Sequence, residues 1–271
     1  MNIGFMGICI LVILLCVPIY LIYFYKLNLQ RKFALALAKV VGYLALTGIM
    51  LEFVFRINNI ALNILWVVLL ALLTSVVTVN RARLTMKSYF IPAFISTLVV
   101  TFGIGVLVVL AAFSTENPFD ARYLIPVTGF ILGGIMESNC KALETYYAGL
   151  RNHNALFYYL LGNGASHNQA VRYFVKRALE RSMIPSLGHM AYIIIGVTPM
   201  VMWAMLLAGS DVYSAVLMQL LTFAMVLAAS PLALLLTLML AKRYAFDEYG
   251  KLKSQKTVNK AEALKRLFCL V

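Results

Sequence analysis

The stretch that organises the chain reads Asn154-Ala-Leu-Phe-Tyr-Tyr-Leu-Leu-Gly-Asn-Gly-Ala-Ser-His-Asn-Gln-Ala170. It lies within residues 146–185, which form the only long polar interval between hydrophobic segments and are called the elbow below. Gly162 and Gly164 flank Asn163, and all three tolerate the positive φ that ends a helix. The elbow is therefore predicted to hold a short helix, a glycine turn and a second helix.

The second helix of the elbow has a clear start at Ser166, which is followed three residues later by Gln169. This spacing is a capping-box pattern, in which two backbone N–H groups are satisfied reciprocally. Apolar residues then recur at helical spacing on one face, opposite a basic face, and Pro185 is expected to stop or kink the helix. Such an elbow suits docking onto a partner. The simpler interpretation is a solvated, positive cytoplasmic loop.

The composition is that of a membrane protein. Of 271 residues, 63% are hydrophobic and 12% are charged, whereas soluble domains are about 45–50% apolar and about 25% charged. The sequence predicts an all-α, polytopic membrane protein of about seven spans at roughly 20 residues each. The net charge of +13 lies mainly in loops and the tail, where basic residues set topology and face lipid headgroups. Nucleic-acid binding is not indicated, because the sequence has no basic domain that also carries stacking aromatic residues.

Seven hydrophobic segments are expected to cross the bilayer. They cover about residues 3–25, 33–55, 60–79, 89–113, 123–143, 187–207 and 212–240. Basic residues follow the first, third and fifth segments and fill the tail, which predicts an N-out, C-in topology. Residues 1–243 then form a transmembrane domain with the elbow between spans five and six, and residues 244–271 form a cytoplasmic basic tail.

Several polar or helix-breaking residues lie within the predicted spans, where they are candidates for a substrate path. They are Glu52, Glu137, Asn139, His189, Pro199 and Gln219. A proline in mid-span frees a backbone carbonyl, and a buried glutamine can bond across helices. A carboxylate in the inner half of a span is costly and is a functional candidate by default.

The charged candidates also have purely structural interpretations. Glu52 can reach the outer headgroups or pair with Arg56, which follows it by four residues. Glu137 can pair in the same way with Lys141. His189 can be a packing residue beside the basic elbow. The sequence alone leaves both interpretations open.

The fifth predicted span combines small residues with possible metal ligands. Gly129, Gly133 and Gly134 recur at three-to-four spacing, which lets helices approach closely. Oxygen, amide and thiol groups follow at residues 137–140, but side chains adjacent on one helix point in different directions. No established metal-binding spacing is present, so no metal site is predicted.

Short motifs in the chain resemble those of ABC-transporter permeases. Those of the elbow are similar to the cytoplasmic loop that inserts into a groove of the ATPase subunit: Gly164-Ala165-Ser166, Gln169-Ala170 and Ile184-Pro185. More narrowly, the chain resembles the FetB-type permeases, implicated in iron export and related to plant aluminium-tolerance transporters, over roughly residues 39–242. Residues 196–202 depart from the family pattern, because no glycine follows Pro199.

The resemblance implies a transport subunit. It assigns ATPase coupling to Gly162, Gly164, Ala165, Ser166, Gln169, Ala170 and Pro185. It implies a homodimer in the cell (inner) membrane, two ATPase subunits that hold ATP and Mg, an exported iron or other metal ion, and no cofactor bound by this chain. The chain has no G-x-x-x-x-G-K-[ST] phosphate loop, so ATP hydrolysis is expected in a separate chain.

A second class of transporter stays open. Glu137 and Glu52 could drive a self-sufficient, proton-coupled secondary transporter or channel that needs no partner. An enzyme is not indicated, because the chain has no H-E-x-x-H, no G-x-S-x-G and no paired catalytic carboxylates on one face. A substrate other than a metal also remains possible from the sequence.

Overall fold

The computed structural model describes residues 5–26, 30–113, 117–193 and 199–245, and its regular structure in these ranges is entirely helical. The all-α prediction is therefore confirmed. The chain divides into two compact units, Met1–Ile57 and Asn58–Val271. Each unit is described by itself.

The N-terminal unit contains two helices, α1 (Phe5–Phe24) and α2 (Gln30–Ile57). They contact each other, and Ile19 and Tyr23 of α1 line a small cavity with Phe33 of α2. α1 carries no charged residue, and many apolar side chains on both helices are exposed. Such faces suit lipid as the surrounding solvent.

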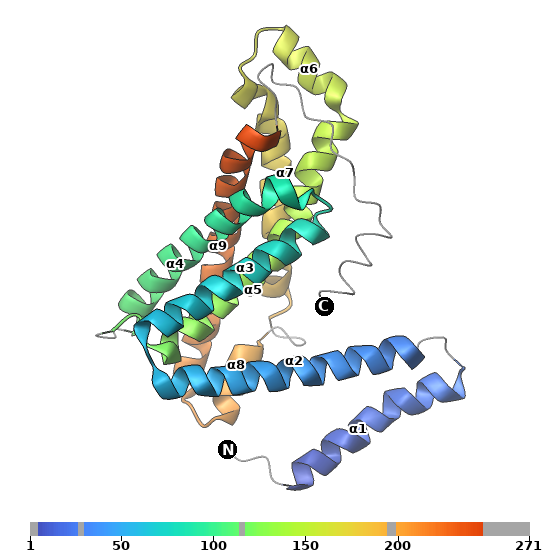
Figure 1. The fold of residues 1–271 in the computed structure, drawn as a ribbon, viewed down its shortest axis with the longest axis vertical. Helices are drawn as coiled ribbons and strands as arrows, with labels where there is room; N and C mark the ends of the chain where they lie inside the picture. The colour runs from blue at the N-terminus through green and yellow to red at the C-terminus, as the bar shows by residue number, and fades with distance from the viewer. Residues whose placement is uncertain (1–4, 27–29, 114–116, 194–198, 246–271) are drawn as a thin grey trace. The chain divides into compact units, whose positions relative to one another are not determined.

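The C-terminal unit is arranged around one long helix, α5, which contacts α3, α4, α7 and α9 (Figure 1). Its helices are α3 (Ile60–Arg81), α4 (Met86–Phe113), α5 (Ala121–Asn152), α6 (Asn154–Gly162), α7 (His167–Ala191), α8 (Met200–Leu207) and α9 (Val212–Ala245). α5 runs nine residues past the predicted end of the fifth span, so the first part of the elbow belongs to this helix. α6 lies beyond the ends of α5 and α7.

Two clusters of buried side chains hold this unit together. One joins α4, α5 and α9, with Ile131, Ile135 and Ala229 among its members. The other lies toward the elbow and includes Tyr147 and Phe157. α5 supplies residues to both clusters, which explains why it is central to the unit.

Local hydrogen bonds explain where the helices begin and how their hydroxyl groups are satisfied. Asn59 and Asp120 cap α3 and α5 by accepting hydrogen bonds from the backbone N–H groups two residues later. The Thr128 hydroxyl donates to the Leu124 carbonyl at 2.7 Å. Ser96 and Thr237 bond across α4 and α9 at 2.5 Å. Buried hydroxyl groups in an apolar bundle need such partners.

Four of the described helices combine the length and apolar composition that crossing a membrane requires. These segments are Phe33–Ile57, Ile60–Arg81, Met86–Phe113 and Val212–Tyr244. A shorter apolar helix covers Cys9–Phe24. The chain is therefore a membrane protein with several apolar spans, and the count of seven stays a prediction.

The predicted sixth span, residues 187–207, is wrong as a single helix. α7 continues through Pro185 to Ala191, so the proline does not stop it. The chain leaves the helix at Tyr192 and Ile193, and α8 begins only after Pro199. Proline has no backbone N–H to donate within a helix. Pro199 is therefore better accommodated at the start of a helix than in its interior.

Candidate functional site

The centre of the candidate site is a contact between α5 and α7. The Nε2 atom of His189 lies 3.3 Å from the Oε2 atom of Glu137, although the two residues are 52 positions apart in the sequence. Both side chains are about half exposed, at 50% and 49%. The structural alternative for Glu137 was a pair with Lys141, but the ion pair found in the described part of the chain is with His189.

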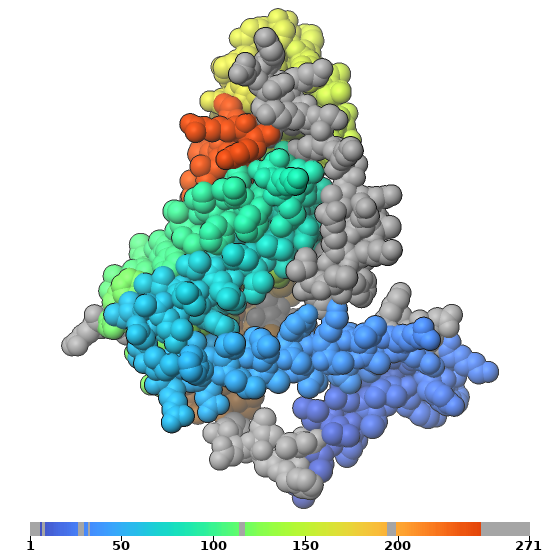
Figure 2. Space-filling view, viewed as in Figure 1, coloured from blue at the N-terminus to red at the C-terminus, as the bar shows by residue number. Residues whose placement is uncertain are grey.

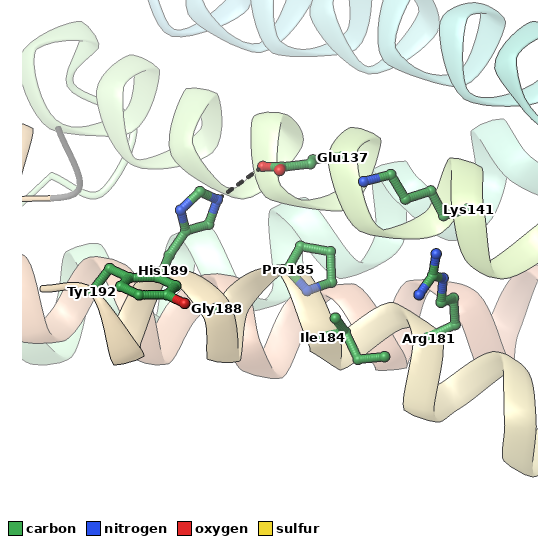
Figure 3. A pocket seen from close by; sticks show the side chains of 8 residues that line it. All are labelled: Glu137, Lys141, Arg181, Ile184, Pro185, Gly188, His189 and Tyr192. Atoms are coloured by element: carbon green, nitrogen blue, oxygen red, sulfur yellow. Dashed lines mark hydrogen bonds and ion pairs between the residues drawn. The ribbon is translucent and has the colours of Figure 1, made fainter. Parts of the chain in front are cut away.

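A cavity of about 300 Å³ opens on one side of this contact, between α5 and α7 (Figure 3). We call it the basic pocket. Besides Glu137 and His189 it is lined by Lys141, Arg181, Ile184, Pro185, Gly188 and Tyr192. The helices bring together one carboxylate, one imidazole and two permanent cations.

A second cavity, of about 530 Å³, lies between α5, α7, α8 and α9 and is also lined by Glu137 and His189. We call it the glycine pocket, because Gly129, Gly133 and Gly134 line it. The remaining lining is mostly apolar: Phe130, Ser186, Met200, Val201, Gln219, Thr222, Phe223 and Val226. The Glu137–His189 contact is thus shared by a basic and a mainly apolar cavity.

The three glycines of α5 do not act alike. A Cβ added at Gly134 would lie 3.0 Å from the Cβ of Val226 in α9 and closer still to both methyl carbons. A Cβ at Gly129 or Gly133 would meet nothing within 4 Å. The predicted close helix approach is therefore found at Gly134, whereas the other two glycines leave room in the cavity.

Two further predicted residues lie at or beside the glycine pocket. Gln219 is buried in α9, and its Oε1 atom accepts a hydrogen bond of 3.2 Å from the backbone N–H of Met202. Pro199 is the residue immediately before α8 and is also buried. The Gln219–Met202 hydrogen bond attaches the start of α8 to α9.

The other predicted path residues lie elsewhere. Asn139 is 3% exposed and faces the interior of the bundle, and it lines neither pocket. Glu52 is exposed on α2, in the N-terminal unit. Among the described residues, no three His, Cys, Asp or Glu side chains come close enough to hold a metal ion. The groups shared by the two pockets that could contact a cation are the Glu137 carboxylate and the His189 imidazole.

The elbow has the local structure that the sequence predicts. Ser166 Oγ accepts from the Gln169 backbone N–H at 3.4 Å, and Gln169 Oε1 accepts from the Ser166 N–H at 2.8 Å, which completes the capping box. Gly164 takes the positive φ, at +82°. Gly162 ends α6, and Asn163 has an ordinary φ of −85°. α6, the turn and α7 follow one another in the predicted order, and the left-handed backbone is confined to one of the three candidates.

The coupling residues assigned from the resemblance fall in two places. Gly162 to Gln169 surround the turn, and Ala170 is buried directly behind it. Pro185 lies far along α7, in the lining of the basic pocket. The structure therefore separates a turn at the end of the unit from a proline beside the Glu137–His189 contact.

The residues 154–165, α6 and the turn, form a tip that protrudes from one end of this unit (Figure 2). Only Phe157 of α6 is buried, at 2% exposure, whereas Tyr159 is 68% and Leu156 is 42% exposed. The buried Phe157 ring packs edge-on against the His167 ring, with 5.8 Å between the ring centroids. The anchoring role of Phe157 was missed in the sequence, because α6 carries several aromatic residues and spacing alone does not show which one is buried.

A second attachment of the elbow was also missed. The Nζ atom of Lys242, near the end of α9, donates to Asn168 Oδ1 at 2.9 Å. Burial and then the nearby Lys242 ammonium lower the pKa of His167. A sequence separation of 74 residues gives no local signal for this contact.

The fold and site define a polytopic, all-α membrane protein with a polar contact between two cavities. Residues 5–246 match the family described as "Uncharacterised protein family (UPF0014)", and the chain belongs to this family. It is 26% identical over 242 residues to the UPF0014 membrane protein slr1647 of Synechocystis, which covers 88% of this chain and 92% of the relative. No solved structure matches the chain significantly.

Two further relatives carry informative names. The chain is 21% identical over 252 residues to the probable iron export permease protein FetB of Escherichia coli, covering 93% of this chain and 95% of FetB. It is 24% identical over 218 residues to the protein ALUMINUM SENSITIVE 3 of Arabidopsis thaliana, covering 80% and 78%. The resemblance found in the sequence motifs is thereby confirmed at the level of the family.

Proposed function

We propose that this chain is the membrane-spanning permease subunit of an ABC transporter, powered by a separate ATPase subunit that docks on the elbow. The observation that carries the proposal is the exposed tip. A nine-residue helix that buries one side chain has little reason to be stable alone. Its exposed Leu156 and Tyr159 provide the kind of apolar and aromatic contact surface that partners use.

The geometry of the turn supports the same partner. The capping box and Gly164 fix the entry of α7, so the tip is preorganised and loses little entropy when a partner binds. The tip faces the cytoplasm in the proposed N-out, C-in arrangement of seven spans, as the basic residues of α7 favour. ABC permeases work in pairs, so a homodimer with two ATPase subunits completes the proposal.

The substrate path in this proposal runs through the glycine pocket and past the Glu137–His189 contact. Carboxylate and imidazole groups are ligands for divalent metals. This chemistry, and the name of the FetB relative, support iron or another metal ion as the exported substrate. Gln219 lines the path, and Pro199 stands at the start of α8. Asn139 lines neither pocket, and Glu52 belongs to the N-terminal unit.

One observation favours a second candidate function. A carboxylate and an imidazole 3.3 Å apart can exchange a proton. The same pair would therefore serve a self-sufficient, proton-coupled secondary transporter or channel. In that case the tip would have no ATPase partner.

The test is co-purification of the tagged full-length chain from its native membranes in mild detergent. A stoichiometric ABC ATPase is expected, and Leu156→Ser with Tyr159→Ser should remove it without changing the thermal stability of the chain. Tyr213→Ser is the matched control, because Tyr213 is 72% exposed at the start of α9, far from α6 in the sequence. Transport by the purified chain alone, with no ATPase recovered, would reject the proposal in favour of the proton-coupled transporter.

A further inference from the structure

The basic pocket has an excess of positive charge, because its one carboxylate, Glu137, is paired with His189 and its two cations have no ion-pair partner among the described residues. Lys141 of α5 and Arg181 of α7 both line this cavity of about 300 Å³. In Figure 3 Arg181 reaches from α7 toward α5, and the Lys141 side chain extends along α5 toward Glu137. In the described part of the chain neither cation forms an ion pair, whereas the single carboxylate of the pocket is paired with His189.

Two cations on different helices that face one cavity repel each other unless an anion lies between them. The amino group of Lys141 and the planar guanidinium of Arg181 offer several N–H donors, and Tyr192 adds a hydroxyl group. Phosphate accepts such charge-assisted hydrogen bonds in a bidentate way from arginine. The pocket is therefore better suited to an anion than to a metal cation.

The surroundings of the pocket indicate where such an anion would come from. Ile184 lines the pocket and is exposed, as is the neighbouring Leu187. Basic pockets between membrane helices on the cytoplasmic side bind phosphate-bearing lipid headgroups. The proposed topology places Lys141 and Arg181 on that side, next to apolar side chains that can contact acyl chains.

We propose that the basic pocket between α5 and α7 binds a phosphate group, from the headgroup of an anionic lipid or from a phosphate-bearing solute. This goes beyond the proposed permease function. The bound phosphate bridges the two helices that carry Glu137 and His189. It therefore stabilises the arrangement in which these two side chains are in contact.

The experiment uses the purified full-length chain alone, so its result does not depend on an ATPase. Native mass spectrometry after reconstitution into nanodiscs of phosphatidylcholine with phosphatidylglycerol measures which lipid is retained. A titration with inorganic phosphate in phosphatidylcholine nanodiscs tests the solute. The wild type should retain phosphatidylglycerol, or bind inorganic phosphate if the source is a solute, and the double variant Lys141→Gln with Arg181→Gln should lose this binding at least tenfold.

The matched control is Arg172→Gln with Lys176→Gln, which removes the same charge from exposed positions of α7 outside the pocket. It should bind as the wild type does. Glu137→Gln should leave phosphate binding unchanged or stronger, since it removes the only negative charge of the pocket. Equal binding by the Lys141/Arg181 double variant and the wild type, or loss of binding only in Glu137→Gln, would overturn the proposal.

Discussion

The contact between α5 and α9 and the tip of the elbow are stabilised in different ways. At the first, Gly134 lies so close to Val226 that there is no space for one more carbon atom. At the second, Phe157 alone is buried, and the rest of α6 is half-buried or exposed. The bundle is held by close packing along a helix, whereas the tip is held by one buried ring, by the partly buried Leu160 and Leu161, and by a capped turn. The difference leaves the side chains of the tip accessible and those of the helix contact inaccessible.

The first way to break this comparison is to remove the anchor of the tip. Replacing a buried phenylalanine with alanine costs about 3–5 kcal/mol, so Phe157→Ala should detach α6 from the bundle. Hydrogen exchange of residues 154–165 should become much faster, while α4, α5 and α9 keep their protection. Tyr159→Ala is the control, because its side chain is exposed and its loss should leave exchange unchanged. Unchanged protection in Phe157→Ala would show that the ring does not hold the tip.

The second test acts on the bundle and uses neighbouring glycines. Gly134→Ala forces a methyl group against Val226, and overpacking of this kind costs about 1–3 kcal/mol. Gly133→Ala enters open space and should be neutral or slightly stabilising, because alanine favours a helix over glycine. Thermal unfolding of the purified chain in detergent compares the two variants directly. Equal unfolding temperatures would contradict the close approach of α5 and α9.

The smallest expected effect is a pH dependence of the elbow. Burial, and then Lys242, lower the pKa of His167 from its usual value of about 6.5. As the pH falls, His167 therefore takes up a proton in the unfolded elbow before it does so in the folded elbow. The contribution of neutral His167 to the stability of the elbow is fully present above about pH 6.5 and is lost as the pH falls through the lowered pKa. Protection factors of residues 167–170 should decrease between pH 7.5 and pH 5.5, and His167→Gln should show a smaller decrease. An equal decrease in the variant would assign the effect to other groups.

The sequence predicts the elbow well because its structure depends on near neighbours. Ser166 and Gln169 are three residues apart, and the positive φ of Gly164 follows from the lack of a Cβ atom. The predicted sixth span fails for the opposite reason, since hydropathy registers an apolar segment but not the chain leaving the helix at Tyr192.

The candidate site is predictable only in part. The sequence indicates Glu137 because a carboxylate is costly within a span, and His189 because imidazole can bind a metal or a proton. Their contact, and the basic pocket beside it, depend on how α5 and α7 pack, and no local pattern encodes that packing. For the same reason the sequence could not show that Gly134 contacts α9 while Gly133 lines a cavity.

The unbroken course of α7 has a mechanical consequence. The helix begins at His167, after the capped turn, and carries His189 near its other end, 22 residues later. At the usual rise per residue this is a lever of roughly 33 Å. A displacement of about 1 Å that moves His189 directly away from Glu137 takes their 3.3 Å distance beyond hydrogen-bond reach. Force on the turn before α7 would thus reach the Glu137–His189 contact through α7 alone. Pro185 is the one proline of α7, and its missing N–H is where the helix can bend.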